Sequence, residues 1–194
     1  MRRLKSGPAQ VKKADTHKYN LVRTAMRLFR RQGYASTGLQ QILDESGAPK
    51  GSLYYYFPNG KEQLAEAAVE MAGGLIREML EGHARRNKDP KRFLRAYCRT
   101  MAGWMEESKY RSGCPIATTL LENAPDSPAI TESGREAING WTQVIAGVFE
   151  RAGKSRREAR EKAQLIVCAM EGALILARVG QSSKPILDVA KLAS

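Results

Sequence analysis

Cysteine and histidine are scarce in this chain of 194 residues. The three cysteines, Cys98, Cys114 and Cys168, are widely separated and odd in number, which excludes a disulfide framework and a C-x-x-C metal clip within the chain. The two histidines, His17 and His83, have no Cys, Asp or Glu at metal-binding spacing. We therefore expect no metal site, and the reducing cytoplasm suits this cysteine usage best.

Long apolar runs are also missing. No apolar stretch of signal-peptide length follows the basic N-terminus, so secretion is not expected. The most apolar segment, residues 163–179, contains Gln164, Glu171 and Arg178 and falls short of the roughly 20 apolar residues of a membrane span. We interpret this segment as a buried helix and expect no membrane partner.

Catalytic motifs are absent as well. The chain has no G-x-S-x-G elbow, no P-loop, no G-x-G-x-x-G after a strand and no paired carboxylates outside ordinary helix surfaces. No segment reads as a convincing strand, whereas prolines stand at apparent helix starts and long stretches are rich in Ala, Leu, Glu, Arg and Met. These features predict an all-α protein that is not an enzyme and needs no cofactor.

Positive charge is what the chain has in excess. Lys and Arg number 32 against 20 Asp and Glu, which gives a formal net charge of +12 and favours a polyanionic partner, either nucleic acid or an anionic membrane. Residues 1–31 hold most of this charge, with a single acidic residue, Asp15. Residues 1–14 have few apolar side chains, and we predict that they form a flexible basic arm that can touch phosphates.

Residues 16–57 carry the most informative pattern. A first helix is predicted from about Thr16 to the residue before Gly33, because apolar residues recur at helical spacing: Val22, Ala25, Met26 and Phe29.

Two shorter helices follow this first helix. Thr37 is predicted to cap a helix over residues 39–46, and Gly47 to end it in the left-handed conformation. Pro49 starts the next helix, which runs to about Phe57. Two short helices joined by a glycine-containing turn are typical of a helix-turn-helix.

The second short helix is the candidate reader of DNA, because a helix-turn-helix places that helix in the major groove. Lysines there would neutralise phosphates, hydroxyl and amide groups would reach base edges or the backbone, and a glycine permits close approach. The alternative is that the tyrosines pack a small core and Lys50 is solvated. The candidate DNA-contacting residues are Thr37, Gln40, Gln41, Lys50, Gly51, Ser52, Tyr54, Tyr55, Tyr56 and Lys61.

The run GYASTGLQQILDESGAPKGSLYYYF over residues 33–57, followed by KEQL at 61–64, resembles the DNA-binding signature of TetR-like transcriptional repressors. Two phrases, GCPIATTLLE at 113–122 and SGAPKGSLYYYFPNGKEQL, are similar to the branch that includes lincomycin-resistance and flavonoid-responsive (LmrA/YxaF-like) repressors. The resemblance implies about nine helices, three in a DNA-binding unit and the rest in a ligand-binding, dimer-forming body. It also implies DNA contacts at the positions of Thr37, Lys50, Gly51, Ser52, Tyr54, Tyr55 and Lys61.

Two positions depart from the common pattern of that family. Tyr56 stands where many members have His, and Gly60 adds a residue before Lys61, a spacing that the LmrA/YxaF-like branch shares. The domains we predict are a flexible arm at 1–14, a helix-turn-helix domain at 15–66, and a ligand-binding and dimerisation domain at 67–194. Further helices are expected at 62–82, 90–108, 115–123, 128–152, 156–180 and 185–192.

Aromatic and methionine side chains form apolar stripes on three successive helices of the predicted body. A pocket lined by such side chains would suit a flat, mostly apolar inducer, although plain core packing explains the same pattern. Cys114 either lines this pocket or is a buried structural cysteine. The candidate ligand-binding residues are Tyr97, Met101, Trp104, Met105, Cys114, Ile116, Leu120, Trp141, Ile145 and Phe149.

The helix over 156–180 is polar at first and then apolar nearly all round, which predicts burial on more than one side. Its small residues suit a helix–helix seam in a homodimer, with core packing inside one subunit as the alternative. Glu171, within the apolar run, is predicted to pair with Arg178 of its own or the partner subunit, or with a ligand donor. The candidate dimer-interface residues are Trp141, Val148, Cys168, Ala169, Gly172 and Leu176.

Together these patterns predict a ligand-responsive transcriptional regulator, expected from the family to be a repressor, that binds a palindromic operator in double-stranded DNA as a dimer. One alternative is a sequence-independent architectural DNA-binding protein, which the net charge favours. The other is a helical small-molecule binder or enzyme whose DNA-binding unit is vestigial.

Overall fold

The computed structural model describes residues 13–193, so most of the predicted basic arm lies outside the described residues. Within that range the chain forms helices and no strand, which confirms the all-α fold. The helices are α1 (Lys13–Gln32), α2 (Leu39–Ser46), α3 (Lys50–Tyr56), α4 (Lys61–Arg86), α5 (Pro90–Glu107), α6 (Ala117–Asn123), α7 (Pro128–Arg151), α8 (Arg156–Gly180), α9 (Lys184–Asp188) and the short 3₁₀ helix η1 (Val189–Ala193).

The predicted helices are all present, with small differences at their ends. The helix expected to end near Gly82 continues to Arg86, since one glycine inside a helix costs only about 1 kcal/mol. The helix expected from 115 begins at Ala117, and the last predicted helix is divided into α9 and η1. Side-chain caps define several starts, because oxygens of Asp89, Ser127 and Ser155 accept backbone N–H groups of α5, α7 and α8.

Thr37 is a correction at the start of α2. The N-cap of this helix is Gly38, and no side chain caps it. The Thr37 side chain is fully buried, and its hydroxyl donates to the carbonyl oxygen of Gly33 at 2.7 Å. Thr37 therefore stabilises the turn between α1 and α2 rather than the helix that follows.

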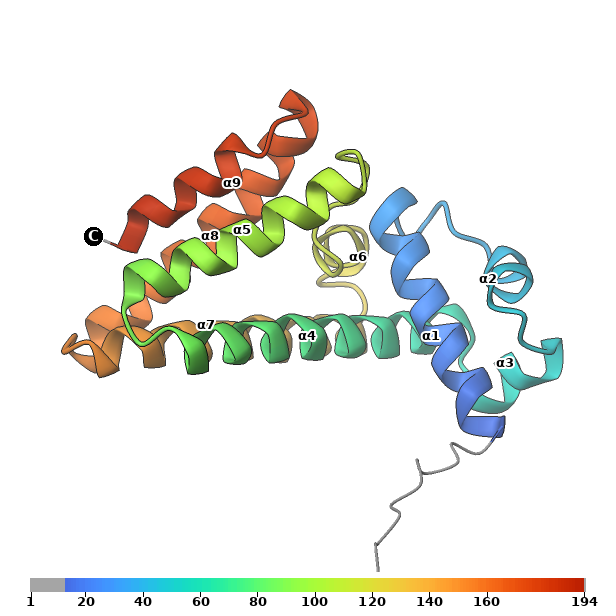
Figure 1. The fold of residues 1–194 in the computed structure, drawn as a ribbon. Coiled ribbons are helices and arrows are strands. Elements are labelled where there is room, and N and C mark those ends of the chain that lie inside the picture. The colour runs from blue at the N-terminus through green and yellow to red at the C-terminus, as the bar shows by residue number, and fades with distance from the viewer. Residues whose placement is uncertain (1–12, 194) are drawn as a thin grey trace, which may run out of the picture.

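The helices form two groups that share the long helix α4 (Figure 1). α1, α2 and α3, which we call the head, lie at one end of α4; α4 to η1 form the body. In the body α4 packs along α7, α7 packs on α8, and α9 and η1 pack against α5 and α8. The predicted domain boundary at residue 66 falls inside α4, so one continuous helix connects the two groups.

A close helix crossing holds α4 against α7. Gly73 on α4 lies so near Ala137 on α7 that there is no room for a side chain at residue 73. Beside this contact the indole Nε1 of Trp141 donates to the carbonyl oxygen of Gly73 at 2.9 Å. Both features tie α4 to α7, so they fix the position of one helix relative to the other.

Within one chain, helix α8 is buried on one side, and burial of its other side by a partner subunit stays a prediction. One face packs inside the chain, through residues such as Ala163, Ile166 and Met170, but the other face is exposed. The exposed face carries large apolar side chains at Leu165, Ile175, Leu176 and Val179. By length and composition α8 is the one helix of the described residues that could cross a membrane, and 39% of its apolar window is buried in the protein.

Candidate nucleic-acid interface

The turn between α2 and α3 occupies residues 47–49. Gly47 has a φ of 64°, the left-handed conformation that its position predicted, and its N–H donates to the carbonyl oxygen of Leu43. Next to the turn, Ile42 of α2 is buried, and so are Leu53 of α3 and Phe57, which follows α3. These contacts fix the angle between the two helices, and the arrangement is a helix-turn-helix.

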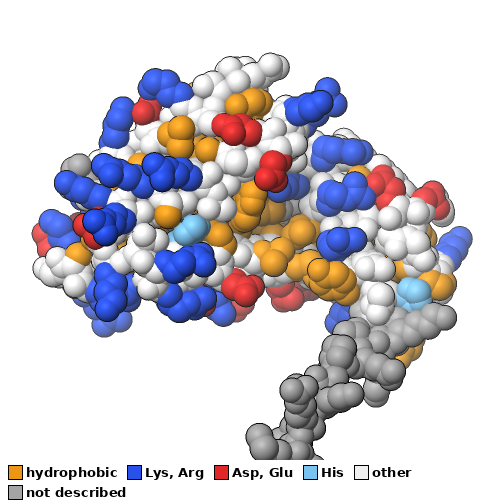
Figure 2. Space-filling view, viewed as in Figure 1, with side chains coloured by type: hydrophobic (Ala, Val, Ile, Leu, Met, Phe, Trp, Pro, Cys, Tyr) orange, Lys and Arg blue, Asp and Glu red, His pale blue; other side chains and the backbone are white. Residues whose placement is uncertain are grey.

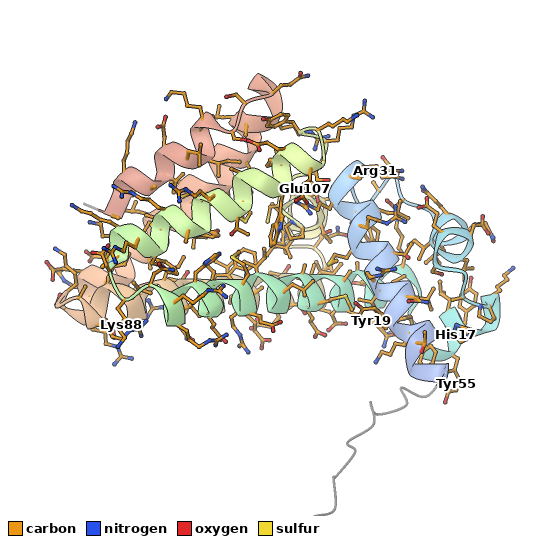
Figure 3. All side chains as sticks on the ribbon, in the orientation of Figure 1. His17, Tyr19, Arg31, Tyr55, Lys88 and Glu107 are labelled. Atoms are coloured by element: carbon orange, nitrogen blue, oxygen red, sulfur yellow. The ribbon has the colours of Figure 1, made fainter. Side chains whose placement is uncertain are left out.

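Helix α3 presents one face to solvent. Lys50 and Gly51 at its start are exposed, Ser52 is half-buried, and the side chains of Tyr54 and Tyr55 are 53% and 79% exposed. Figure 3 shows Tyr55 at the outer end of the molecule, away from the body. This face has the lysine, hydroxyl and aromatic groups that suit contacts with phosphates and base edges.

Tyr56 differs from its two neighbours. Its side chain is half-buried and packs against the core. Its ring makes edge-on contacts with those of Tyr55, at 4.9 Å between centroids, and Phe57. The Tyr56 ring therefore helps to hold the Tyr55 ring in place. A direct DNA contact at Tyr56 stays a prediction.

The side chains of the two glutamines of α2 differ in how many hydrogen bonds they form. Gln40 is exposed, and its amide nitrogen donates to Asp44 at 2.8 Å. Both polar atoms of the Gln41 amide form hydrogen bonds. Its oxygen accepts from the Gln32 amide nitrogen at 3.0 Å, and its nitrogen donates to the Glu45 carboxylate at 2.9 Å. Gln41 would have to give up these contacts before it could bind DNA, whereas Gln40 would give up one exposed hydrogen bond.

The side chains of Thr37 and Lys61 are both engaged in contacts within the chain. Because the Thr37 side chain is fully buried and bonded to Gly33, it cannot offer its hydroxyl to a phosphate in this arrangement, which corrects the predicted contact. The Lys61 ammonium lies over the ring of Tyr34, 4.2 Å from its centroid, and donates to the carbonyl oxygen of Ala35 at 3.4 Å. Burial lowers the pKa of Lys61, and its phosphate contact stays a prediction.

Helix α6 links the body to the head through contacts that the sequence did not indicate. The carboxylate of Glu122 accepts the backbone N–H groups of Tyr34 and Ala35 at 3.1 and 2.5 Å. The Thr118 hydroxyl donates to the carbonyl oxygen of Phe29 at 3.1 Å. These contacts cover the end of α1 and the turn into α2, so a movement of α6 would be transmitted to the helix-turn-helix.

Glu122→Gln tests this link. We expect the variant to lower the free energy of unfolding by about 1 kcal/mol, because each N–H group is accepted by a different oxygen of Glu122 and glutamine replaces one of these oxygens with an NH₂ group that cannot accept. Chemical denaturation measures the change. Glu150→Gln, an exposed carboxylate on α7, is the matched control and should leave stability nearly unchanged. Equal stability of the two variants would show that the Glu122 contact does not hold the head to the body.

The predicted ligand-binding residues are mostly core residues. Trp104 and Leu120 are half-buried, and the others are buried. Cys114 lies within hydrogen-bonding reach of Glu171, beside the buried Tyr97. Burial raises the pKa of all three groups, so each favours its neutral form more than it would in water.

The expected pairing of Glu171 with Arg178 within one chain is wrong. Seven residues of helix place the two side chains about 10 Å apart along the axis, and no ion pair joins them in the described structure. The neighbours of Glu171 are instead Cys114 and Tyr97. In the described part of the chain, no group of three or more His, Cys, Asp or Glu lies together as a metal site would require.

A cavity of about 630 Å³ lies elsewhere, between the head and the body. It is bounded by α1, by α4 and by the end of α5, and Trp104 is the one predicted ligand-binding residue that lines it. The remaining lining residues were not among the predicted ligand-binding residues. A binding role for the other predicted residues stays a prediction.

The predicted dimer-interface residues divide into two sets. Trp141 and Val148 are covered within one chain, Trp141 by its contact with Gly73, so their assignment to a surface between subunits is wrong. Cys168 and Gly172 are exposed on α8, as is Leu176 at 61%, and Ala169 is half-buried. The second set lies on the same helix as the exposed apolar residues of α8.

Comparisons with known proteins agree with this architecture. Residues 21–68 match the family described as bacterial regulatory proteins, tetR family. Residues 90–192 match the family described as transcriptional regulator LmrA/YxaF-like, C-terminal domain.

Two relatives come from Bacillus subtilis (strain 168). The chain is 34% identical over 169 residues to the HTH-type transcriptional regulator LmrA, covering 87% of this chain and 90% of that protein. It is 33% identical over 171 residues to the uncharacterized HTH-type transcriptional regulator YxaF, covering 88% and 90%.

Solved structures show the same fold. The regulatory protein TetR from Rhodobacter sphaeroides aligns with a TM-score of 0.80 at 21% identity, covering 90% of this chain and 95% of that one. A TetR transcriptional regulator from Chloroflexus aurantiacus aligns with a TM-score of 0.78 at 28% identity, covering 94% and 95%. These relatives are regulators rather than enzymes. With a matching head, a matching body and relatives that span nearly the whole chain, the protein belongs to the TetR family of helix-turn-helix transcriptional regulators and carries a C-terminal domain of the LmrA/YxaF-like type.

Proposed function

We propose that the protein is a homodimeric, ligand-responsive repressor that binds a palindromic operator and acts in the cytoplasm. The observation that carries the DNA-binding part is the exposed face of α3, where Lys50, Tyr54 and Tyr55 stand on a helix-turn-helix held by a buried core. Base contacts from the start of α3 would specify the sequence, and phosphate contacts would fix the register.

The exposed apolar face of α8 supports the dimer. Leu165, Ile175, Leu176 and Val179 form an exposed apolar patch on one helix, and such patches mark interaction sites. Pairing this face with a second copy about a twofold axis would bury it. The two α3 helices would then read two inverted half-sites, about 34–36 Å apart or somewhat more.

Release by a ligand would use the contacts between body and head. A flat, mostly apolar inducer bound in the body would favour one arrangement of α6 and α4 over another, and α6 is bonded to the turn between α1 and α2 through Glu122. A changed distance between the two heads would no longer match successive major grooves. Identical head separation with and without an effective inducer, measured by small-angle scattering, would contradict this mechanism.

Two substitutions on α3 separate phosphate contacts from base contacts. Lys50→Ala should weaken binding to all duplexes and flatten the salt dependence by about one unit, because one counterion fewer is released. Ser52→Ala should change the preference among sequences more than the affinity for non-specific DNA. Fluorescence anisotropy over a range of salt concentrations measures both effects. If both variants changed binding to every sequence equally, these roles would be wrong.

The net charge of +12 favours a second candidate, a sequence-independent architectural DNA-binding protein. Counterion release would then dominate, so affinity would fall steeply with salt and differ little between sequences. The same anisotropy measurements distinguish the two proposals, because only a base-reading protein retains a preferred sequence at high salt.

A further inference from the structure

The cavity between head and body has walls of two kinds. One wall is apolar and is formed by Leu75, Ile76 and Met79 of α4 with Trp104 of α5. The opposite wall is α1, which contributes arginines. Figure 2 shows the apolar part as a hollow between the two masses of the molecule, with basic side chains beside it. Its volume of about 630 Å³ lies within the range of small-molecule sites.

The apolar wall is incompletely covered. Leu75 is 50% exposed, and Met79 and Trp104 are half-buried although they pack against the core. Covering these side chains with an apolar ligand would remove them from water, which is favourable in proportion to the area buried. The wall therefore suits the apolar part of a ligand.

The arginines of the basic wall are not equivalent. Arg27 is neutralised by Glu45, at 2.6 Å, and Arg23 extends over the ring of Tyr19. Arg30 donates from Nε to the carbonyl oxygen of Gly113 at 2.6 Å, and its Nη groups have no acceptor among the described residues. Arg30 is half-buried, and this burial lowers the pKa of its guanidinium. A guanidinium in this position is a strong site for an anionic group that offers two acceptor oxygens, such as a carboxylate or a sulfonate.

The opposite charge at the rim limits what can bind. Glu107, which is labelled in Figure 3, also lines the cavity and is the last residue of α5. A second negative charge on the ligand would approach this carboxylate and be repelled. The cavity therefore suits a ligand with a single anionic group at one end.

We propose that this cavity binds an amphipathic organic anion, with its charged group on Arg30 and its apolar part on Leu75, Met79 and Trp104. Such a ligand would contact α1 of the head and α4 and α5 of the body at once. Its binding would then be coupled to the head–body arrangement, and so to DNA affinity, by thermodynamic linkage. Only this consequence rests on the proposed repressor function; the binding itself does not.

The test uses the full-length protein and two fluorescent probes. Anilinonaphthalene sulfonate is an apolar ring system with one sulfonate, and phenyl-naphthylamine is the same ring system without the charge. Leu75→Glu places a carboxylate on the exposed apolar wall and should weaken sulfonate binding by about tenfold or more. Leu121→Glu, on the 81%-exposed Leu121 of α6, is the matched control and should bind the probe as the unmodified protein does.

Arg30→Met tests the anionic end of the ligand. It should weaken binding of the sulfonate probe by about tenfold while leaving the neutral probe nearly unchanged, and Arg31→Met, on an exposed neighbour, should change neither. Sulfonate binding that survives both Leu75→Glu and Arg30→Met, or that is lost equally in the control variants, would overturn the proposal. Because no operator is present, failure here leaves the proposed DNA binding intact, and failure to bind DNA leaves this result intact.

Discussion

Leu176→Glu should convert the protein from a dimer to a monomer. Leu176 lies on the exposed face of α8, next to Ile175 and one turn before Val179, which is 80% exposed. In a dimer that pairs these faces, the new carboxylate would be buried without a partner, which costs several kcal/mol. Analytical ultracentrifugation measures the change in mass.

The same substitution should lower operator affinity by about 100-fold or more, because two linked half-site contacts become two independent ones. The control is Leu121→Glu, which changes another exposed leucine, on α6. This variant should remain dimeric. A dimeric Leu176→Glu variant with normal operator binding would show that α8 does not form the subunit interface. Leu176 is exposed within the subunit, so loss of folding is not the expected cause of either effect.

Gly73→Ala should lower the free energy of unfolding by about 1–3 kcal/mol. A Cβ at residue 73 would lie 2.6 Å from the Cβ of Ala137, so α4 and α7 would have to separate. The separation would also disturb the hydrogen bond from Trp141 to the carbonyl oxygen of Gly73. Urea denaturation followed by the fluorescence of the two tryptophans, Trp104 and Trp141, measures the change in stability.

The adjacent glycine supplies the control. Gly74 is exposed, and a Cβ there would meet nothing within 4 Å. Gly74→Ala should therefore stabilise the protein by about 0.5–1 kcal/mol, because alanine is the better helix former. Two substitutions of the same kind, one residue apart, should thus change stability in opposite directions. The same sign for both would show that the α4–α7 crossing is looser than described.

Much of the fold could be predicted because its signals are local. Pro90 and Pro128 mark helix starts, Gly47 marks a left-handed helix end, and apolar residues at helical spacing mark the buried faces. Helix boundaries depend on such short-range effects, so they were predicted within a few residues. The exposed residues of α3 follow from the same reasoning, since Leu53 and Phe57 fix which face is buried.

Contacts between distant segments could not be predicted in this way. Nothing near Glu122 indicates that its carboxylate accepts N–H groups 87 and 88 residues earlier in the chain. Thr37 was predicted to cap α2 because threonine is a common capping residue and stands just before that helix. Its hydroxyl instead donates to the carbonyl oxygen of Gly33. Trp141 and Val148 were misplaced because periodicity shows that a face is apolar but not which neighbour covers it.

The central claim is that the protein reads base sequence as a dimer. Selection from random duplex DNA with the purified protein at about 150 mM salt, where non-specific contacts are weakened, tests it most directly. Sequencing of the selected duplexes should give an inverted repeat whose half-sites are about one helical turn apart. Enrichment of no motif by a folded protein that binds DNA at low salt would contradict the claim and favour an architectural DNA-binding role.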